Sequence, residues 1–134
     1  MLQVGQTEID ALAEVIRSGR MFRYEIGNAC ENFEERYAGF IGTSHVALCS
    51  SGTTALTAAL AGLNIGPGDE VIVPAHTYMA TALAVLSVGA IPVVVDIDDS
   101  ITMDPDALRA TIGPQTRAVI PVHMWGALCD MDPS

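Results

Sequence analysis

The residues with the clearest chemical potential are the hydroxyl and glycine residues at positions 50–54, which read SSGTT. An apolar run at 45–49 precedes them and predicts a short buried strand, and the apolar spacing over 55–63 predicts a helix. Small residues at such a corner let a ligand approach the backbone, and the first helical turn offers unpaired N–H groups and the positive end of the helix dipole. The pattern is typical of phosphate binding, although a helix start capped by serine or threonine has the same composition.

The charge balance limits the partners of the chain. It carries 16 acidic residues against 6 basic ones, and all the basic residues are arginines, because the sequence contains no lysine. Nucleic acid and anionic membrane surfaces are therefore excluded as expected partners. The 3 cysteines lack a CxxC pair, so we expect neither a disulfide framework nor a metal site, and a reducing cytoplasm is the expected compartment. No signal peptide is recognisable at the N-terminus.

The elements that must position this corner follow an alternating order. Helices are predicted at 7–18, 29–40, 55–62, 79–88 and from 104 onward, and strands at 45–49, 70–74, 92–96 and 117–123. The uncharged stretch 71–95 is long enough for a transmembrane helix, but Pro74, Gly89 and Pro92 interrupt it. We interpret it as strand, helix and strand, because strands of a parallel sheet that are buried on both faces also read as apolar runs.

This alternation predicts an α/β fold with a mostly parallel sheet in three layers. In the predicted helix 29–40, Asn28 is the expected cap, and four residues are expected on the buried inner face: Cys30, Phe33, Tyr37 and Phe40. The alternation calls for a further helix after the strand 117–123. We therefore expect residues 1–134 to form a single incomplete domain, the N-terminal segment of a larger one whose C-terminal part is absent.

Four segments in series resemble the DegT/DnrJ/EryC1/StrS sugar aminotransferases, a family of fold-type I enzymes that depend on pyridoxal phosphate (PLP). The segments are SSGTTAL at 50–56, GPGDEVIVPAHTYMATA at 66–82, GAIPVVVDID at 89–98 and TRAVIPVHMWG at 116–126. The resemblance implies the N-terminal part of the fold-type I large domain. It also implies that Gly52, Thr53 and Thr54 hold the PLP phosphate and that Tyr78 stacks on the pyridine ring.

The histidines and a group of aspartates are further candidates. His123 ends a predicted strand, where open α/β sheets bind ligands, so it is a candidate accessory residue at the cofactor or substrate, with a structural role as the alternative. His45 and His76 are interpreted as structural or solvated. The carboxylates of Asp96, Asp98 and Asp99 are interpreted as turn caps, and no metal site is predicted.

The sequence departs from the family at one decisive point. The family requires a lysine that forms the internal aldimine with PLP and an aspartate at the pyridine nitrogen, and neither segment occurs here. We therefore interpret the chain as the N-terminal part of an aminotransferase that transfers an amino group from glutamate or glutamine to a keto sugar. We expect this sugar to be linked to a nucleotide. No catalytic residue is assigned within these residues beyond the accessory His123, and the chain alone is expected to be inactive.

Three alternatives remain open. The whole protein can be a PLP- or PMP-dependent sugar dehydratase of the same family, in which another residue replaces the lysine. The chain can instead be a stand-alone binding module that has a phosphate corner and no chemistry. A plain dinucleotide binder is disfavoured by the absence of GxGxxG. The resemblance implies a homodimer for the full-length protein.

Overall fold

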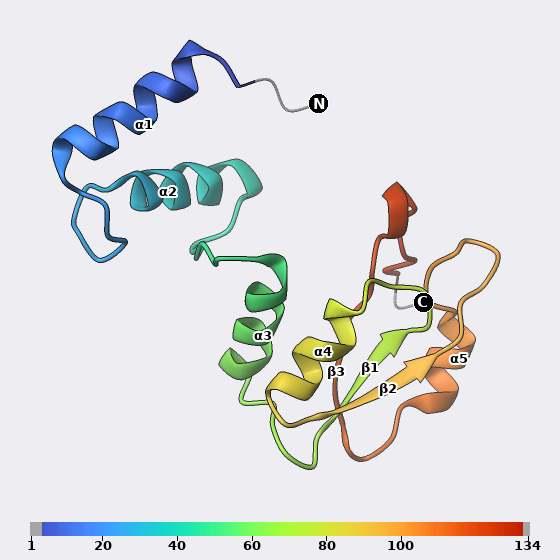
Figure 1. The fold of residues 1–134 in the computed structure, drawn as a ribbon. Coiled ribbons are helices and arrows are strands. Elements are labelled where there is room, and N and C mark those ends of the chain that lie inside the picture. The colour runs from blue at the N-terminus through green and yellow to red at the C-terminus, as the bar shows by residue number, and fades with distance from the viewer. Residues whose placement is uncertain (1–3, 133–134) are drawn as a thin grey trace. The chain divides into compact units, whose positions relative to one another are not determined.

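The computed structural model describes residues 4–132, and these form two compact units, one that ends at Leu48 and one that begins at Cys49. The first unit contains two helices, α1 (Gln6–Ser18) and α2 (Ala29–Ile41), as Figure 1 shows. Both helices end at a glycine in the left-handed conformation, Gly19 at φ 72° and Gly42 at φ 74°, where a residue without a Cβ is favoured. The predicted helices 7–18 and 29–40 are thus confirmed.

Asn28 caps α2 as predicted, but the predicted burial of the α2 inner face is wrong. The Asn28 side chain accepts a hydrogen bond from the Glu31 N–H at 3.0 Å. Phe33 and Phe40 are 47% and 83% exposed, and the rings of Phe33 and Tyr37 stack on each other with centroids 5.3 Å apart. An apolar stripe is buried only where another element covers it, and no described element of this unit does so.

The second unit alternates helices and strands (Figure 1). Its elements are α3 (Gly52–Gly62), β1 (Glu70–Pro74), α4 (Ala80–Ser87), β2 (Ile91–Val95), α5 (Pro105–Thr111), β3 (Thr116–Val119) and one 3-10 turn, η1 (Met124–Gly126). The strands form a parallel sheet in the order β2-β1-β3, with β1 in the centre. All parallel strands end at the same edge of the sheet, so the loops that follow β1, β2 and β3 lie at one edge.

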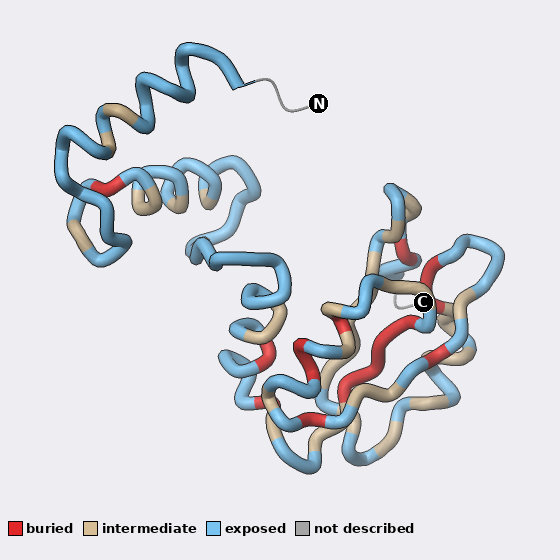
Figure 2. Tube along the Cα trace, in the orientation of Figure 1, coloured by how far each residue is buried: buried red, intermediate tan, exposed pale blue. Residues whose placement is uncertain are grey.

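The core of this unit lies on both faces of β1. Val71 and Val73 pack on one face against residues of α3 and α4, and Ile72 packs on the other with residues next to and within α5. The continuous burial of β1 is visible in Figure 2. An uninterrupted β-branched run is what a strand covered on both faces requires, so the predicted three-layer α/β arrangement is confirmed.

Two predicted strands differ from the observed ones. The prediction of a buried strand at 45–49 is wrong: in the described part of the chain these residues pair with no strand, and the Leu48 N–H donates instead to the Glu34 carboxylate at 2.6 Å. A strand exists only where a neighbour accepts its backbone hydrogen bonds, and sequence composition does not supply that neighbour. The predicted strand 117–123 is confirmed only over its first part, because β3 ends at Val119.

The uncharged stretch 71–95 is confirmed as strand, helix and strand, namely β1, α4 and β2. None of the helices that the structure describes is long and apolar enough to cross a membrane. The prediction of a single incomplete domain over residues 1–134 stays a prediction.

Candidate functional site

The corner at 50–54 is an N-capped helix start. Ser51 has an extended backbone, at φ −161° and ψ 163°, and its Oγ accepts a hydrogen bond from the Thr54 N–H at 3.1 Å. The Thr54 hydroxyl lies 3.0 Å from Ser51 Oγ and 3.3 Å from Ser50 Oγ. Thr54 is therefore engaged by the two serines through both its backbone and its side chain.

Two backbone donors of the same turn have a different environment. Within residues 4–132, no acceptor is found for the N–H groups of Gly52 and Thr53. A Cβ built on Gly52 would meet no atom within 4 Å, so the surface beside these donors is open. The donors that the helix itself cannot satisfy are thus accessible at the positive end of the helix dipole, which is the physical basis of an anion site.

Tyr78 lies in the loop 75–79, which joins the carboxyl end of β1 to α4. The loop is held at its base by a hydrogen bond of 2.8 Å from the Ala75 N–H to the Val95 carbonyl, and by the hydroxyls of Thr77 and Thr81, which lie 2.7 Å apart. The Tyr78 side chain is 78% exposed, and no other aromatic ring of the described residues stacks on it. Its position leaves the ring able to cover a planar ligand at the carboxyl edge of the sheet.

His123 is exposed beyond the end of β3, in a segment that is not a strand. Its Nδ1 accepts a hydrogen bond from the Cys129 N–H at 3.1 Å, and the Cys129 thiol donates to the Val122 carbonyl at 3.1 Å. A backbone N–H can only donate, so Nδ1 carries no proton and the proton of the neutral ring lies on Nε2. His123 therefore presents a hydrogen-bond donor, Nε2–H, at the end of β3.

A second histidine connects the loops that follow all three strands. His76 follows β1, and its Nδ1 lies 3.3 Å from the carbonyl oxygen of Ile101, in the loop after β2. The His76 ring also meets the ring of Trp125, beyond β3, edge to face with centroids 5.5 Å apart and an interplanar angle of 87°. The structural interpretation of His76 agrees with these contacts. Sequence reasoning missed Trp125 and Ile101, because no local pattern indicates that these three loops meet.

Of the carboxylates at 96–99, that of Asp98 caps a turn within its own loop. The Asp98 carboxylate accepts a hydrogen bond from the Ser100 N–H at 2.8 Å, and hydrogen bonds from the Ser100 side chain and backbone lower the pKa of Asp98 below its ordinary value. Asp104 caps α5 through the Asp106 N–H at 2.8 Å. No group of 3 or more histidine, cysteine, aspartate or glutamate side chains in the described residues is arranged to hold a metal ion.

The segment 20–24 carries two arginines, Arg20 and Arg23, and both bind other residues of the first unit. Arg23 forms an ion pair of 2.5 Å with Glu34, and the Arg20 guanidinium donates to the Gly27 carbonyl at 3.4 Å. Two hydrogen bonds lower the pKa of the Glu34 carboxyl below its ordinary value. The one from the Leu48 N–H has the larger effect, and the one from Arg23 the smaller. These contacts give the segment a structural role within its unit.

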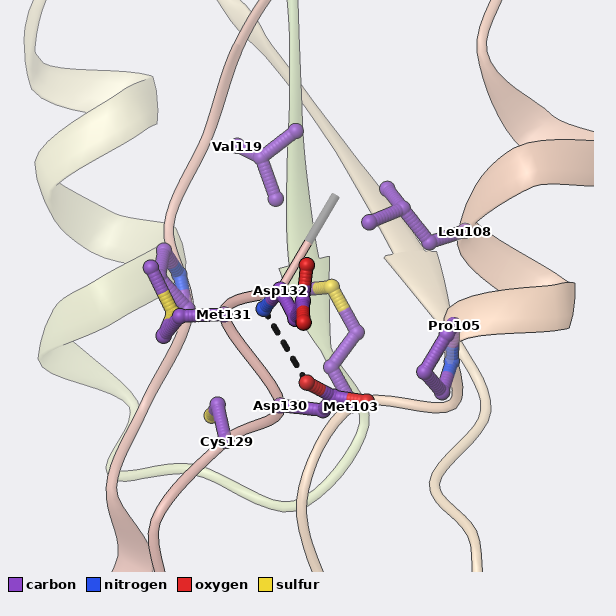
Figure 3. A pocket seen from close by; sticks show the side chains of 9 residues that line it. Met103, Pro105, Leu108, Val119, Cys129, Asp130, Met131 and Asp132 are labelled. Atoms are coloured by element: carbon purple, nitrogen blue, oxygen red, sulfur yellow. Dashed lines mark hydrogen bonds between the residues drawn. The ribbon is translucent and has the colours of Figure 1, made fainter. Parts of the chain in front are cut away.

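A cavity of about 320 Å³ lies on the α5 side of the sheet (Figure 3). The residues lining it are Met103, Pro105, Leu108, Val119, Pro121, Cys129, Asp130, Met131 and Asp132. It is mostly apolar, and none of the predicted site residues lines it. His123 contacts the cavity only through Cys129, which lines it.

Comparison with known proteins identifies the family of the chain. The sequence model of the DegT/DnrJ/EryC1/StrS aminotransferase family matches residues 3–133. The chain belongs to this family. It is 49% identical over 123 residues to dTDP-3-amino-3,4,6-trideoxy-alpha-D-glucose transaminase of Streptomyces venezuelae, a match that covers 91% of this chain and 32% of the relative. It is 43% identical over 127 residues to UDP-2-acetamido-2-deoxy-3-oxo-D-glucuronate aminotransferase of Pseudomonas aeruginosa, covering 93% of this chain and 34% of the relative.

Solved structures of the family match the fold closely. The structure of S. venezuelae DesV in complex with a ketimine intermediate matches with a TM-score of 0.82 and 43% identity, over 94% of this chain and 34% of that one. The PLP form of a sugar aminotransferase from Streptococcus pneumoniae, Spr1654, matches with a TM-score of 0.87 and 38% identity, over 96% and 32% of the two chains. The fold is thus that of the DegT/DnrJ/EryC1/StrS aminotransferases, which use PLP, and the chain spans about a third of the length of these relatives.

Proposed function

We propose that the protein carrying these residues is a PLP-dependent aminotransferase that transfers an amino group from glutamate or glutamine to a nucleotide-linked keto sugar. The observation that carries this proposal is the corner at 50–54, where two accessible backbone donors begin α3 in a chain of the DegT/DnrJ/EryC1/StrS family. The donor set fits a phosphate dianion, because N–H groups and hydroxyls supply hydrogen bonds without a competing carboxylate in the SSGTT segment.

We assign the phosphate contacts residue by residue. The N–H groups of Gly52 and Thr53 donate to phosphate oxygens, and the Thr53 hydroxyl adds a further donor. Thr54 acts through its hydroxyl, which the two serine hydroxyls already orient. Gly52 keeps the approach open, since any Cβ there would project into the space that the anion needs.

The remaining site residues orient the ring and the substrate. Bound PLP supplies an electron sink that stabilises negative charge at the carbon beside the transferred nitrogen. Tyr78, on the loop after β1, stacks on the face of the pyridine ring and fixes its tilt. His123 donates its Nε2–H to an oxygen of the bound cofactor or substrate, because Cys129 occupies its other nitrogen.

The absence of lysine determines what this chain can do alone. A nitrogen nucleophile is required to bind PLP covalently and to carry the proton during amino transfer, and residues 1–134 contain no lysine side chain. We propose that the chain alone is inactive and that the lysine comes from outside these residues. Treated with PLP and borohydride, the chain should give no reduced adduct within its body by peptide mass mapping. A specific internal adduct would contradict this assignment.

One experiment tests the proposed reaction in the full-length protein. The protein is loaded with PLP and supplied with glutamate or glutamine and a panel of dTDP-, UDP- and GDP-linked keto sugars. The masses of the products are measured by mass spectrometry. Replacement of the carbonyl by an amine supports the proposal. Loss of a hydroxyl group would identify the second candidate, a PLP- or PMP-dependent sugar dehydratase of the same family. The absence of PLP binding would leave a non-catalytic binding module.

The assembly and the compartment belong to the same proposal. We place the full-length enzyme in the cytoplasm, where nucleotide-linked sugars are available, and we propose that it acts as a homodimer. Size-exclusion chromatography with light scattering measures the second point directly, and a monomer that retains full activity would contradict it.

A further inference from the structure

The tip of the segment after β3 is a tight turn with an unusual residue in it. The Ala127 N–H donates to the Met124 carbonyl at 2.9 Å, and the two residues between them, Trp125 and Gly126, both have left-handed backbones, at φ 50° and φ 91°. This is the geometry of a type I′ turn, whose central positions favour glycine, asparagine and aspartate. Trp125 therefore holds a large aromatic side chain at a position where its Cβ costs conformational free energy.

Packing within the unit does not compensate for this cost. The Trp125 side chain is 84% exposed, and its indole ring packs edge to face against the ring of His76. Ile101, whose carbonyl lies beside His76 Nδ1, is also left-handed, at φ 60°, although its side chain is β-branched. Two strained residues thus meet one histidine at the carboxyl edge of the sheet. Strain of this kind persists at functional sites, where the surrounding contacts impose it.

We infer that Trp125 is the platform on which the sugar ring of the substrate rests, an inference that rests on the proposed function. A sugar ring presents a face of C–H groups and a rim of hydroxyls. An exposed indole matches both, because its face is apolar and its N–H donates a hydrogen bond. The position agrees as well, since open α/β sheets bind ligands outside the carboxyl ends of their strands.

The link to the cofactor site runs through the loop 75–79. His76, which holds the indole from one side, and Tyr78, which we assign to the cofactor ring, are two positions apart in this loop. A sugar resting on Trp125 would therefore be bound at the sheet edge that carries the cofactor stack. His76 acts here as a positioning residue for the indole.

The test measures the fluorescence emission of Trp125 in the full-length protein. This emission is obtained by subtracting the spectrum of Trp125→Phe from that of the parent protein. UDP-N-acetylglucosamine and dTDP-glucose are the probes, and UDP and dTDP are the matched controls. We expect the nucleotide sugars to change the emission where the nucleotides alone do not. No response, an equal response to the bare nucleotides, or an emission already typical of a buried indole before ligand is added would overturn the inference.

A substitution that relieves the strain separates recognition from folding. Trp125→Asn suits the left-handed position, so it should melt at the same or a higher temperature while binding the nucleotide sugars at least tenfold more weakly by calorimetry. Trp125→Phe keeps an aromatic face and should bind within a few-fold of the parent protein. Unchanged affinity in Trp125→Asn would refute the platform. If PLP and the amino donor still react but the Trp125 substitutions leave the affinity for the nucleotide sugars unchanged, the inference fails and the proposed function stands. If the protein does not bind PLP, the proposed function fails.

Discussion

Ser51 and Thr54 form the reciprocal contact that begins α3: the Thr54 N–H donates to Ser51 Oγ at 3.1 Å, and the two hydroxyls lie 3.0 Å apart. One serine side chain thus satisfies a backbone donor that the helix cannot satisfy. Because this cap binds only the Thr54 N–H, the N–H groups of Gly52 and Thr53 remain available as hydrogen-bond donors in the first turn of α3. The cap and the proposed anion site are therefore parts of one arrangement.

The cap predicts a stability effect that does not depend on the cofactor. Ser51→Ala removes the acceptor of the Thr54 N–H, and we expect it to lower the free energy of unfolding by about 1 kcal/mol. Ser51→Asp retains a side-chain acceptor beside the positive helix end and should stay close to the parent protein. Urea unfolding followed by circular dichroism measures both variants. An unchanged midpoint in Ser51→Ala would show that the cap contributes nothing.

Gly52 allows the anion site to be tested separately from the fold. Since a Cβ at Gly52 meets no atom within 4 Å, Gly52→Val should leave the folded structure intact and should weaken PLP binding by more than tenfold in the full-length protein. Gly62→Val is the matched control, because it makes the same change at the other end of α3, where the added Cβ also meets no atom within 4 Å. Equilibrium dialysis with PLP compares the two. Equal affinities would mean that the corner is only a helix cap.

The sequence predicted best what is decided locally. The Asn28 cap of α2 and the buried strand β1 depend on neighbouring residues and on an uninterrupted run of β-branched residues, and both appear in the structure. The segment 45–49 has the composition of a strand, yet its pairing depends on distant residues that composition does not specify.

The part of the site that the sequence missed depends on contacts between loops. His76 meets Ile101 and Trp125 only because the ends of three parallel strands lie at one edge. The left-handed backbone of Trp125 has no local signature other than the following Gly126, and a lone glycine predicts many different turns. Conformations imposed by tertiary contacts are not encoded in a short pattern.

Glu34 predicts a pH dependence for the first unit. The Leu48 N–H and the Arg23 guanidinium bind its carboxylate and lower its pKa below the ordinary value of 4.5. A depressed carboxyl pKa stabilises the fold above the unfolded pKa, and this contribution is lost as the pH falls through the lowered value. Glu34→Gln should therefore lower the melting temperature at pH 7, and the difference from the parent protein should shrink below about pH 4.5.

The exposed neighbour Glu35 provides the control for this measurement. Glu35→Gln removes the same charge from the same helix, so any effect of net charge alone appears in both variants. Thermal melts followed by circular dichroism at pH 7 and pH 3 compare them with the parent protein. A Glu34→Gln difference that stays constant across this range would contradict the assigned contacts.

Tyr78 predicts a loss of cofactor orientation without a loss of stability. Because the side chain is 78% exposed, Tyr78→Ala removes little buried surface, and the melting temperature of this chain should change by no more than a degree or two. In the full-length protein the same change should weaken PLP binding by about 1 kcal/mol, roughly five-fold, and shift the cofactor absorption band, because the stacked ring is lost. Tyr78→Phe keeps the ring and should retain both the affinity and the band. Absorption titrations with PLP distinguish the three proteins, and an identical band in Tyr78→Ala would remove Tyr78 from the cofactor site.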